Sequence, residues 1–115
     1  MPVLLRGLVA LSTPSYARPM VVEWLTFPVS RAELASWLPI EEQVWSRYLE
    51  QQPGFLRKEM WVEEGDEALV HAVIWWNSRE EWKRITPEQV VAVDARMGAA
   101  YRDCTMRVFD VVRDC

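Results

Sequence analysis

The chain is predicted to be an α+β protein with the ferredoxin-like element order β-α-β-β-α-β. Three observations predict this class. Four short apolar runs with the alternation of strands are separated by two longer segments with helical spacing. Three helix starts carry the capping-box pattern, a hydroxyl residue followed three positions later by Glu or Gln. The second and third apolar runs are joined by a short acidic link that contains glycine, which is typical of an antiparallel hairpin. We therefore expect a four-stranded antiparallel sheet with both helices on one face.

The first strand is expected over residues 20–27 and the first helix directly after it. Alternation places Val21, Glu23, Leu25 and Phe27 on one side of this strand, and Val22, Trp24 and Thr26 on the other. Ser30 and Glu33 form the first capping box. Pro39 is expected to break or kink this helix, with a second segment over about residues 40–51 that ends at Pro53-Gly54.

The remaining elements follow the same logic. The second and third strands are expected over residues 55–63 and 68–77, and the fourth over residues 104–112. Ser78 with Glu81 opens a short helix, and Thr86 with Gln89, aided by proline at the first helical position, opens one that runs to about residue 102.

The third strand is apolar on both sides, and this predicts a homodimer. One row holds Ala68, Val70, Ala72, Ile74 and Trp76, and the other holds Leu69, His71, Val73 and Trp75. The helices can cover only one of these rows. Leaving the other in water would expose more apolar surface than soluble monomers usually show, so a second copy is the simplest cover.

Length and composition restrict the class of protein. The 115 residues are expected to form one domain over 20–115, preceded by a flexible or loosely docked extension over 1–19, with a secretion or surface-binding signal as the alternative. The apolar run over residues 1–11 is too short to span a membrane as a helix. With 13 Lys and Arg against 17 Asp and Glu, and no long basic run, no nucleic-acid partner is expected. The two cysteines, Cys104 and Cys115, lack metal-ligand spacing and are expected to be reduced thiols, as in the cytoplasm.

Several short motifs resemble a known family. They are Pro53-Gly54-Phe55, Lys58-Glu59-Met60-Trp61 and Glu80-Glu81-Trp82-Lys83, together with the opening Val22-Glu23-Trp24. Taken together over about residues 20–113, they resemble an uncharacterised cyanobacterial family related to the antibiotic-biosynthesis monooxygenase domain. That domain belongs to the dimeric α+β barrel superfamily, whose members include cofactor-free quinone-forming oxygenases and haem-degrading enzymes. The resemblance implies a dimer that holds a small aromatic ligand between sheet and helices and needs no cofactor. The single His cannot be matched to the iron ligand of the haem degraders.

Three titratable residues on the strands are candidates for chemistry. His71 shares its row with Trp75 and could act as a base towards an activated phenol or bind haem iron; the alternative is a structural His bonded to a backbone carbonyl. Glu59 and Glu23 lie among apolar neighbours, where burial would raise the carboxyl pKa and suit a general base. Alternatively, each pairs with an Arg or Lys across the sheet or the dimer, for instance Arg57 or Arg107.

Trp24, Trp61 and Trp75 are candidate ligand-binding residues, since a flat ligand stacks well on indole rings; the alternative is that they are packing residues. Three functions remain open from the sequence. The first is a cofactor-independent monooxygenase acting on a small aromatic molecule near His71 and Trp75. The second is a non-catalytic dimer that binds a hydrophobic or tetrapyrrole-like ligand or docks to a larger complex, and the third is a purely structural dimer.

Overall fold

The computed structural model describes residues 20–66 and 68–114. The expected N-terminal extension and Cys115 lie outside the described residues.

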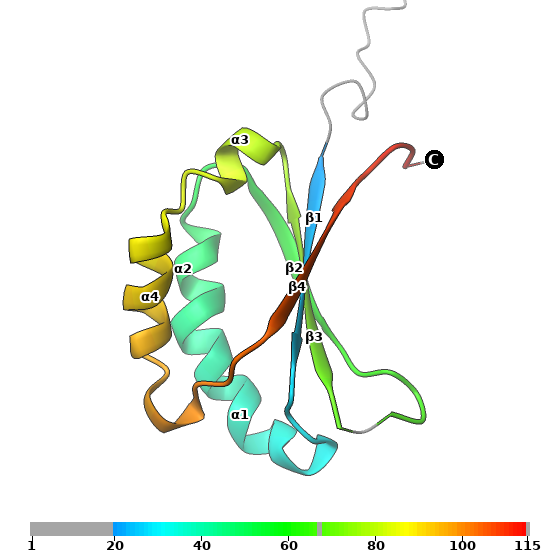
Figure 1. Ribbon diagram of the computed structural model, residues 1–115, viewed down its shortest axis with the longest axis vertical. Helices are drawn as coiled ribbons and strands as arrows, with labels where there is room; N and C mark the ends of the chain where they lie inside the picture. Colours follow the sequence, from blue (N-terminus) through cyan, green and yellow to red (C-terminus); the bar gives the residue numbers. More distant parts are fainter. Residues whose placement is uncertain (1–19, 67, 115) are drawn as a thin grey trace, which may run out of the picture.

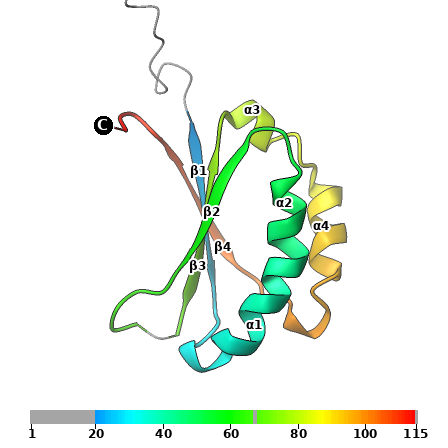
Figure 2. The ribbon, with the colours of Figure 1, turned by 180° about the vertical axis from the view of Figure 1, so that it is seen from behind.

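The four expected strands form a single antiparallel sheet. They are β1 (Val21–Phe27), β2 (Phe55–Trp61), β3 (Val70–Trp76) and β4 (Thr105–Asp110), in the order β2-β3-β1-β4 (Figure 1). The helices all lie on one side of this sheet, as both views of the ribbon show (Figure 2). The predicted α+β, ferredoxin-like class is therefore confirmed.

The first helical segment is continuous but irregular. It runs through a 3₁₀ turn (η2, Arg31–Glu33), α1 (Leu34–Glu41), a π-helical turn (η3, Glu42–Ser46) and α2 (Arg47–Glu50). Of the break or kink expected at Pro39, the break is wrong, because α1 continues through this residue. Proline removes only one helical hydrogen bond, and Trp37 and Glu41 on either side of it are each 3% exposed, so packing against the sheet holds the helix together. The irregularity comes three residues later, in the π turn.

The second helical segment begins at the two predicted caps. The Ser78 hydroxyl accepts the backbone N–H of Glu81 at 3.1 Å at the start of α3 (Arg79–Trp82). Thr86 and Gln89 make the reciprocal capping box of α4 (Pro87–Ala95). The expected extension of α4 to residue 102 is wrong. Gly98 has a φ of +58°, which an α-helix does not accommodate, and a short 3₁₀ turn (η4, Gly98–Ala100) follows.

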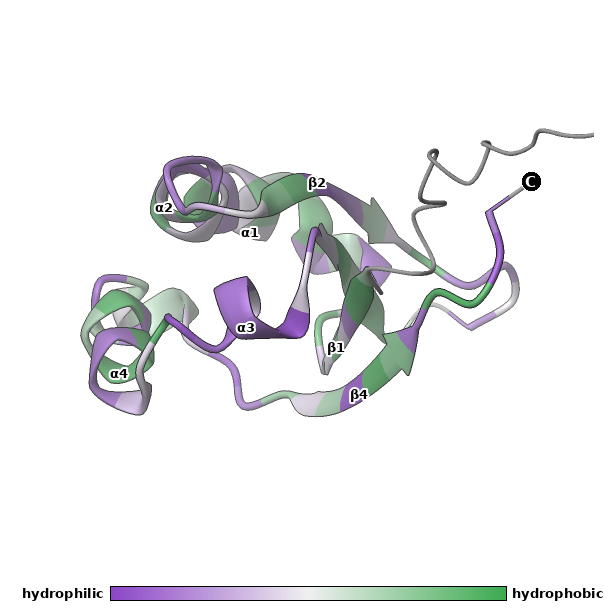
Figure 3. Cartoon of the chain, turned by 90° about the horizontal axis from the view of Figure 1, so that it is seen from above, coloured by the Kyte–Doolittle hydropathy of each residue, from purple (hydrophilic) through white to green (hydrophobic). Residues whose placement is uncertain are grey.

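The core lies between the sheet and the helices. The sheet residues that point towards the helices come from alternate positions: Val21, Glu23, Leu25, Phe27, Phe55, Lys58, Met60, Val70, Ala72, Ile74, Trp76, Met106 and Val108. Trp76, with no exposed surface, packs with Leu49 of α2 and Trp82 of α3. Figure 3 shows that the strands and helices on either side of this space carry many apolar residues.

The opposite side of the sheet, called the open face here, is covered by no described element (Figures 2 and 3). Its residues are Val22, Trp24, Thr26, Arg57, Glu59, Trp61, His71, Val73, Trp75, Thr105, Arg107 and Phe109. Trp61 and Phe109 are each 38% exposed, although both are large and apolar. The two predicted rows of β3 are thus confirmed, with Ile74 and Trp76 towards the helices and His71 and Trp75 on the open face.

Candidate functional site

A cavity of about 630 Å³ lies between the sheet and the helices, and we call it the helix-side cavity. Its walls come from all four strands and from both helical segments, and most of its lining is apolar, including Leu25, Ile74, Trp45 and Trp82. Six charged residues also line it: Glu23, Glu41, Lys58, Lys83, Asp94 and Arg102. A mainly apolar hollow of this volume with a few polar groups has the size and character of a site for a small organic molecule.

Glu23 brings a carboxylate onto the sheet wall of the cavity. Its Oε1 accepts a hydrogen bond from the indole N–H of Trp76 at 3.2 Å. Burial raises the pKa of Glu23 above its ordinary value of 4.5, while the bond from Trp76 and the nearby charge of Lys58 oppose this rise. A carboxylate with a raised pKa is a stronger base than one in water, and it faces an apolar ligand site.

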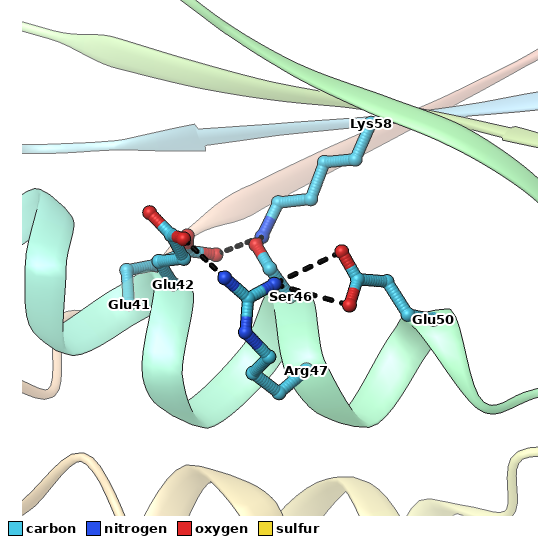
Figure 4. Close-up of polar contacts among 6 residues, drawn as sticks. All are labelled: Glu41, Glu42, Ser46, Arg47, Glu50 and Lys58. Carbon is cyan, nitrogen blue, oxygen red and sulfur yellow. Dashed lines mark hydrogen bonds and ion pairs between the residues drawn. The ribbon is translucent and has the colours of Figure 1, made fainter.

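Lys58 enters the same cavity from β2 and is held by the first helical segment (Figure 4). Its ammonium is paired with the Glu41 carboxylate and donates a hydrogen bond to the Ser46 hydroxyl at 2.9 Å. The two charged side chains are only 6% and 5% exposed. Burial lowers the pKa of Lys58, and the neighbouring Glu41 carboxylate partly restores it.

The π turn explains how the helix holds Lys58. Glu41 is the last residue of α1 and Ser46 the last of the π turn, and both point towards the strand (Figure 4). Arg47, the next residue, points outward and pairs with Glu42 and Glu50, all three being about half exposed. Because π turns in helices often occur at functional sites, this irregular segment supports the cavity as the candidate site.

The rim of the cavity carries further polar groups from the second helical segment and the chain after it. The Asp94 carboxylate accepts the indole N–H of Trp45 at 2.9 Å, and partial burial raises its pKa. The hydrogen bond from Tyr101 to Asp103, 2.7 Å long, raises the pKa of Tyr101 to about 12. Cys104 is a free cysteine here, and burial of its sulfur raises the thiol pKa. Tyr101 and Cys104 are thus protonated near neutral pH.

Five of the six residues expected from the sequence to carry function lie on the open face, and the sixth, Glu23, lines the helix-side cavity. His71 stands between Trp24 and Thr26: its Nδ1 accepts the indole N–H of Trp24 at 3.1 Å and lies 2.9 Å from the Thr26 hydroxyl. An indole nitrogen can only donate, so Nδ1 carries no proton in this arrangement. The Nδ1 partners of His71 among the described residues are thus two side chains and not a backbone carbonyl.

Glu59 and the other two tryptophans complete this group. The Trp61 indole N–H donates to Glu59 at 2.9 Å. Arg57, one of the two arginines considered as partners, pairs with Glu59 at 3.3 Å, although along β2 and not across the sheet. The Arg57 guanidinium also lies over the Trp75 ring, 4.0 Å from its centre. Trp61 meets the ring of Trp24 edge-on at 5.2 Å. The cluster is aromatic, polar and partly exposed.

The expected ligand position beside His71 and Trp75 is wrong in its geometry. A ligand between sheet and helices contacts the other row of β3, which holds Ala72 and Ile74, because neighbouring strand residues point to opposite faces. A catalytic role for His71 or Glu59, or a binding role for Trp24, Trp61 and Trp75, would require a ligand on the open face, and those roles stay predictions.

The sequence reasoning selected Glu23 but missed the buried pair of Lys58 and Glu41. Two sequence patterns, strand alternation and helical spacing, indicate this pair. Lys58 alternates with Arg57 and Glu59, so it points to the opposite side of β2, and Glu41 follows the buried Trp37 by one helical turn. Within residues 20–66 and 68–114, no three His, Cys, Asp or Glu side chains gather in a way that could hold a metal ion. None of the helices in this part of the chain is long and apolar enough to cross a bilayer.

Comparison with solved structures finds several proteins of the same fold. A monooxygenase from Streptomyces coelicolor, solved in complex with the ligand nanaomycin D, is 15% identical with a TM-score of 0.67, and the match covers 86% of this chain and 92% of that one. A variant of SnoaB, a cofactor-independent oxygenase from Streptomyces nogalater, is 18% identical with a TM-score of 0.64, covering 83% and 95%. An antibiotic biosynthesis monooxygenase is 16% identical with a TM-score of 0.58, covering 81% and 99%. No protein-family model and no curated protein matches the chain.

These similarities define a class by fold. The chain has the ferredoxin-like α+β fold of antibiotic biosynthesis monooxygenases, which confirms the expected relation at that level. At identities of 15% to 18% the shared fold does not transfer an activity or a residue role.

Proposed function

We propose that this chain is a cofactor-independent monooxygenase that acts on a small aromatic molecule bound in the helix-side cavity. The observation that carries the proposal is that the Glu23 carboxylate lines a largely apolar cavity of about 630 Å³. Burial raises the pKa of this carboxylate. The similarity in fold to cofactor-independent oxygenases supports it. The assignment to a cyanobacterial family is a finer prediction that rests on the sequence motifs alone.

The reaction requires a proton acceptor and an apolar site that holds the ring. An activated phenol, such as an anthrone, must lose a proton so that its electron-rich carbanion can reduce oxygen directly. One oxygen atom then becomes the new carbonyl oxygen, and the other leaves as water with the two hydrogens of the oxidised CH₂ group. Glu23 accepts the first proton in this scheme, and the apolar walls hold the flat ring and exclude water.

Oxygen uptake with a panel of anthrones and hydroquinones tests this function. We expect turnover to quinones by the wild type and loss of about 100-fold in rate for Glu23→Gln, the usual contribution of one general base. Glu59→Gln and His71→Ala are matched controls on the open face and should keep the rate. Loss of activity in these controls but not in Glu23→Gln would move the site to the open face, as the sequence predicted.

A non-catalytic binding function is the second candidate. Trp45 and Trp82 line the cavity, so a bound aromatic molecule would quench their fluorescence. Saturable quenching by anthrones without oxygen uptake or product would favour this binding function over the oxygenase. A tetrapyrrole-like ligand belongs in the same titration.

The open face supports a homodimer as the functional unit. Trp61 and Phe109 are exposed there beside Trp24, and burying such side chains contributes about 1.5–3 kcal/mol each. A two-fold pairing of identical faces is the commonest way to cover them. Light scattering should give twice the 13.5 kDa of one chain, and Trp61→Asp should shift it to the monomer.

Val91→Asp is the control for this experiment, because Val91 is 68% exposed on α4, away from the open face, and its replacement should leave the dimer intact. A single chain of 13.5 kDa at micromolar concentration would contradict the dimer.

A further inference from the structure

The chain uses lysine sparingly. It contains two lysines, Lys58 and Lys83, against eleven arginines. Both lysines line the helix-side cavity, whereas the basic residues elsewhere in the chain are arginines. Lysine differs from arginine in one chemical respect that matters in a cavity: its amine can lose a proton and act as a nucleophile, whereas a guanidinium stays protonated.

The two lysines have contrasting surroundings. Lys83 is exposed at the rim, and its ammonium lies 4.2 Å from the centre of the Trp82 ring. Lys58 has a side chain that is 6% exposed and a nitrogen fixed by Glu41 and Ser46 at the cavity wall. Lys58 is therefore shielded from bulk water but faces the hollow that would receive a ligand.

The neighbours of Lys58 supply what an amine needs to react. The Glu41 carboxylate is in direct contact with the nitrogen and can take its proton, and burial already lowers the pKa of Lys58. Glu23 lies on the other side of Ile74 in the same row of the sheet, and burial raises its pKa, so this carboxyl can give a proton as well as accept one. A carboxylic acid next to a free amine can give a proton to a departing water molecule.

We propose that Lys58 binds aldehydes and ketones covalently, as imines, when their apolar body fits the helix-side cavity. The ammonium passes one proton to Glu41, and the free amine adds to the carbonyl carbon to give a carbinolamine. Loss of water from this adduct forms the C=N bond, with Glu23 protonating the leaving oxygen. The proton that Glu41 took then passes to Glu23 through the released water, so both carboxyl groups end in the state in which they began. The product is a protonated imine and one water molecule, so no oxidant or reductant takes part.

The charge balance supports this adduct. The protonated imine carries the same single positive charge as the ammonium that it replaces, so the buried Glu41 carboxylate keeps its partner. The inference depends on the cavity and the Lys58 cluster and does not depend on the oxygenase reaction, because imine formation consumes no oxygen.

Reductive trapping tests the inference on the full-length protein. The wild type is incubated at neutral pH with 2-naphthaldehyde and cyanoborohydride, and the modified residues are located by peptide mass spectrometry. We expect Lys58 to be labelled at least about tenfold faster than Lys83, because an aldehyde bound in the cavity is held beside the Lys58 nitrogen. The rate at Lys58 should saturate with aldehyde concentration, since binding in the cavity precedes reaction.

Three controls make the result decisive. Lys58→Arg keeps a cation beside Glu41 and should lose the fast label, whereas Lys83→Arg should keep it. In concentrated urea the two lysines should react at similar rates. Equal or faster labelling of Lys83 in the folded wild type, or no label on Lys58, would overturn the inference whether or not the Lys58→Arg variant folds.

Discussion

Glu23 of β1 and Lys58 of β2 flank Ile74 of β3 in one row of the sheet, and both side chains enter the helix-side cavity. They are not paired with each other in a salt bridge, because Lys58 binds Glu41 and Glu23 accepts from Trp76. The sheet side of the cavity thus brings Glu23 close to the buried pair of Lys58 and Glu41, three of the six charged residues that line it. Burial raises the pKa of Glu23, and the Trp76 hydrogen bond and the charges of Lys58 and Lys83 oppose this rise without cancelling it.

Glu23→Gln should make the stability of the protein less dependent on pH. Because the pKa of Glu23 is raised in the folded state, the folded chain binds its proton more tightly than the unfolded chain does. The stabilisation from Glu23 is fully present below 4.5 and is lost as the pH rises through the raised value. Urea unfolding of both proteins from pH 4 to 8 should show the variant gaining relative to the wild type with increasing pH. The gain should reach about 1.4 kcal/mol for every pH unit that separates the folded pKa from the unfolded one. A constant difference across this range would contradict the raised pKa.

Removing one partner of the buried Lys58–Glu41 pair should lower the free energy of unfolding strongly, whereas replacing both partners by apolar residues should change it little. Glu41→Leu leaves the Lys58 ammonium buried without its carboxylate and should lower the free energy of unfolding by about 3–5 kcal/mol. The double variant Glu41→Leu/Lys58→Met should recover most of this loss, because two apolar side chains can fill the same space. Denaturant titrations of the two single variants and the double variant measure the coupling.

The exposed pair of Arg47 and Glu50 serves as the comparison for that cycle. Both side chains are about half exposed, so Arg47→Ala should change stability by less than about 1 kcal/mol. An equal loss for Arg47→Ala and Glu41→Leu would mean that burial does not set the strength of these pairs.

Much of the fold follows from the sequence because its signals are local. Alternation assigns Glu23 and Leu25 to one side of β1, and the capping residues Ser78 and Thr86 place two helix starts correctly. Ends of elements are less well predicted. The fourth helix ends at Ala95 and not near residue 102, since Gly98 adopts a left-handed conformation that the apolar spacing does not reveal.

The candidate site is harder to predict, for two physical reasons. Both rows of β3 are apolar, so alternation separates His71 from Ile74 but does not say which row the helices cover. The π turn after Glu41 adds an extra residue to its turn and so changes which side chains face the sheet. A regular helical spacing therefore fails to bring Glu41 and Ser46 to the same lysine.

The hydroxyl of Tyr48 is buried without a hydrogen-bond partner among the described residues. Its ring packs against Trp45 and contacts both core clusters, so the ring contributes to stability while the hydroxyl does not. Tyr48→Phe keeps the ring and removes the unpaired group, and we expect it to raise the free energy of unfolding by about 1 kcal/mol. Thermal and urea unfolding measure this, and a loss of stability would indicate a partner, such as a buried water molecule, for the hydroxyl.

Gly54 should tolerate no side chain, for a reason that Gly65 does not share. Both glycines have a φ of +87°, so alanine at either position costs about 1 kcal/mol in backbone strain. A Cβ at Gly54 would also lie 2.5 Å from the Cβ of Glu81, whose carboxylate accepts from Asn77 and Ser78 at the start of α3. A Cβ at Gly65 meets nothing within 4 Å. Gly54→Ala should therefore destabilise the protein by about 2 kcal/mol or more beyond Gly65→Ala, because it displaces the cap of α3 as well. Equal losses in urea unfolding would show that the backbone conformation alone, and not the contact with Glu81, requires glycine at this turn.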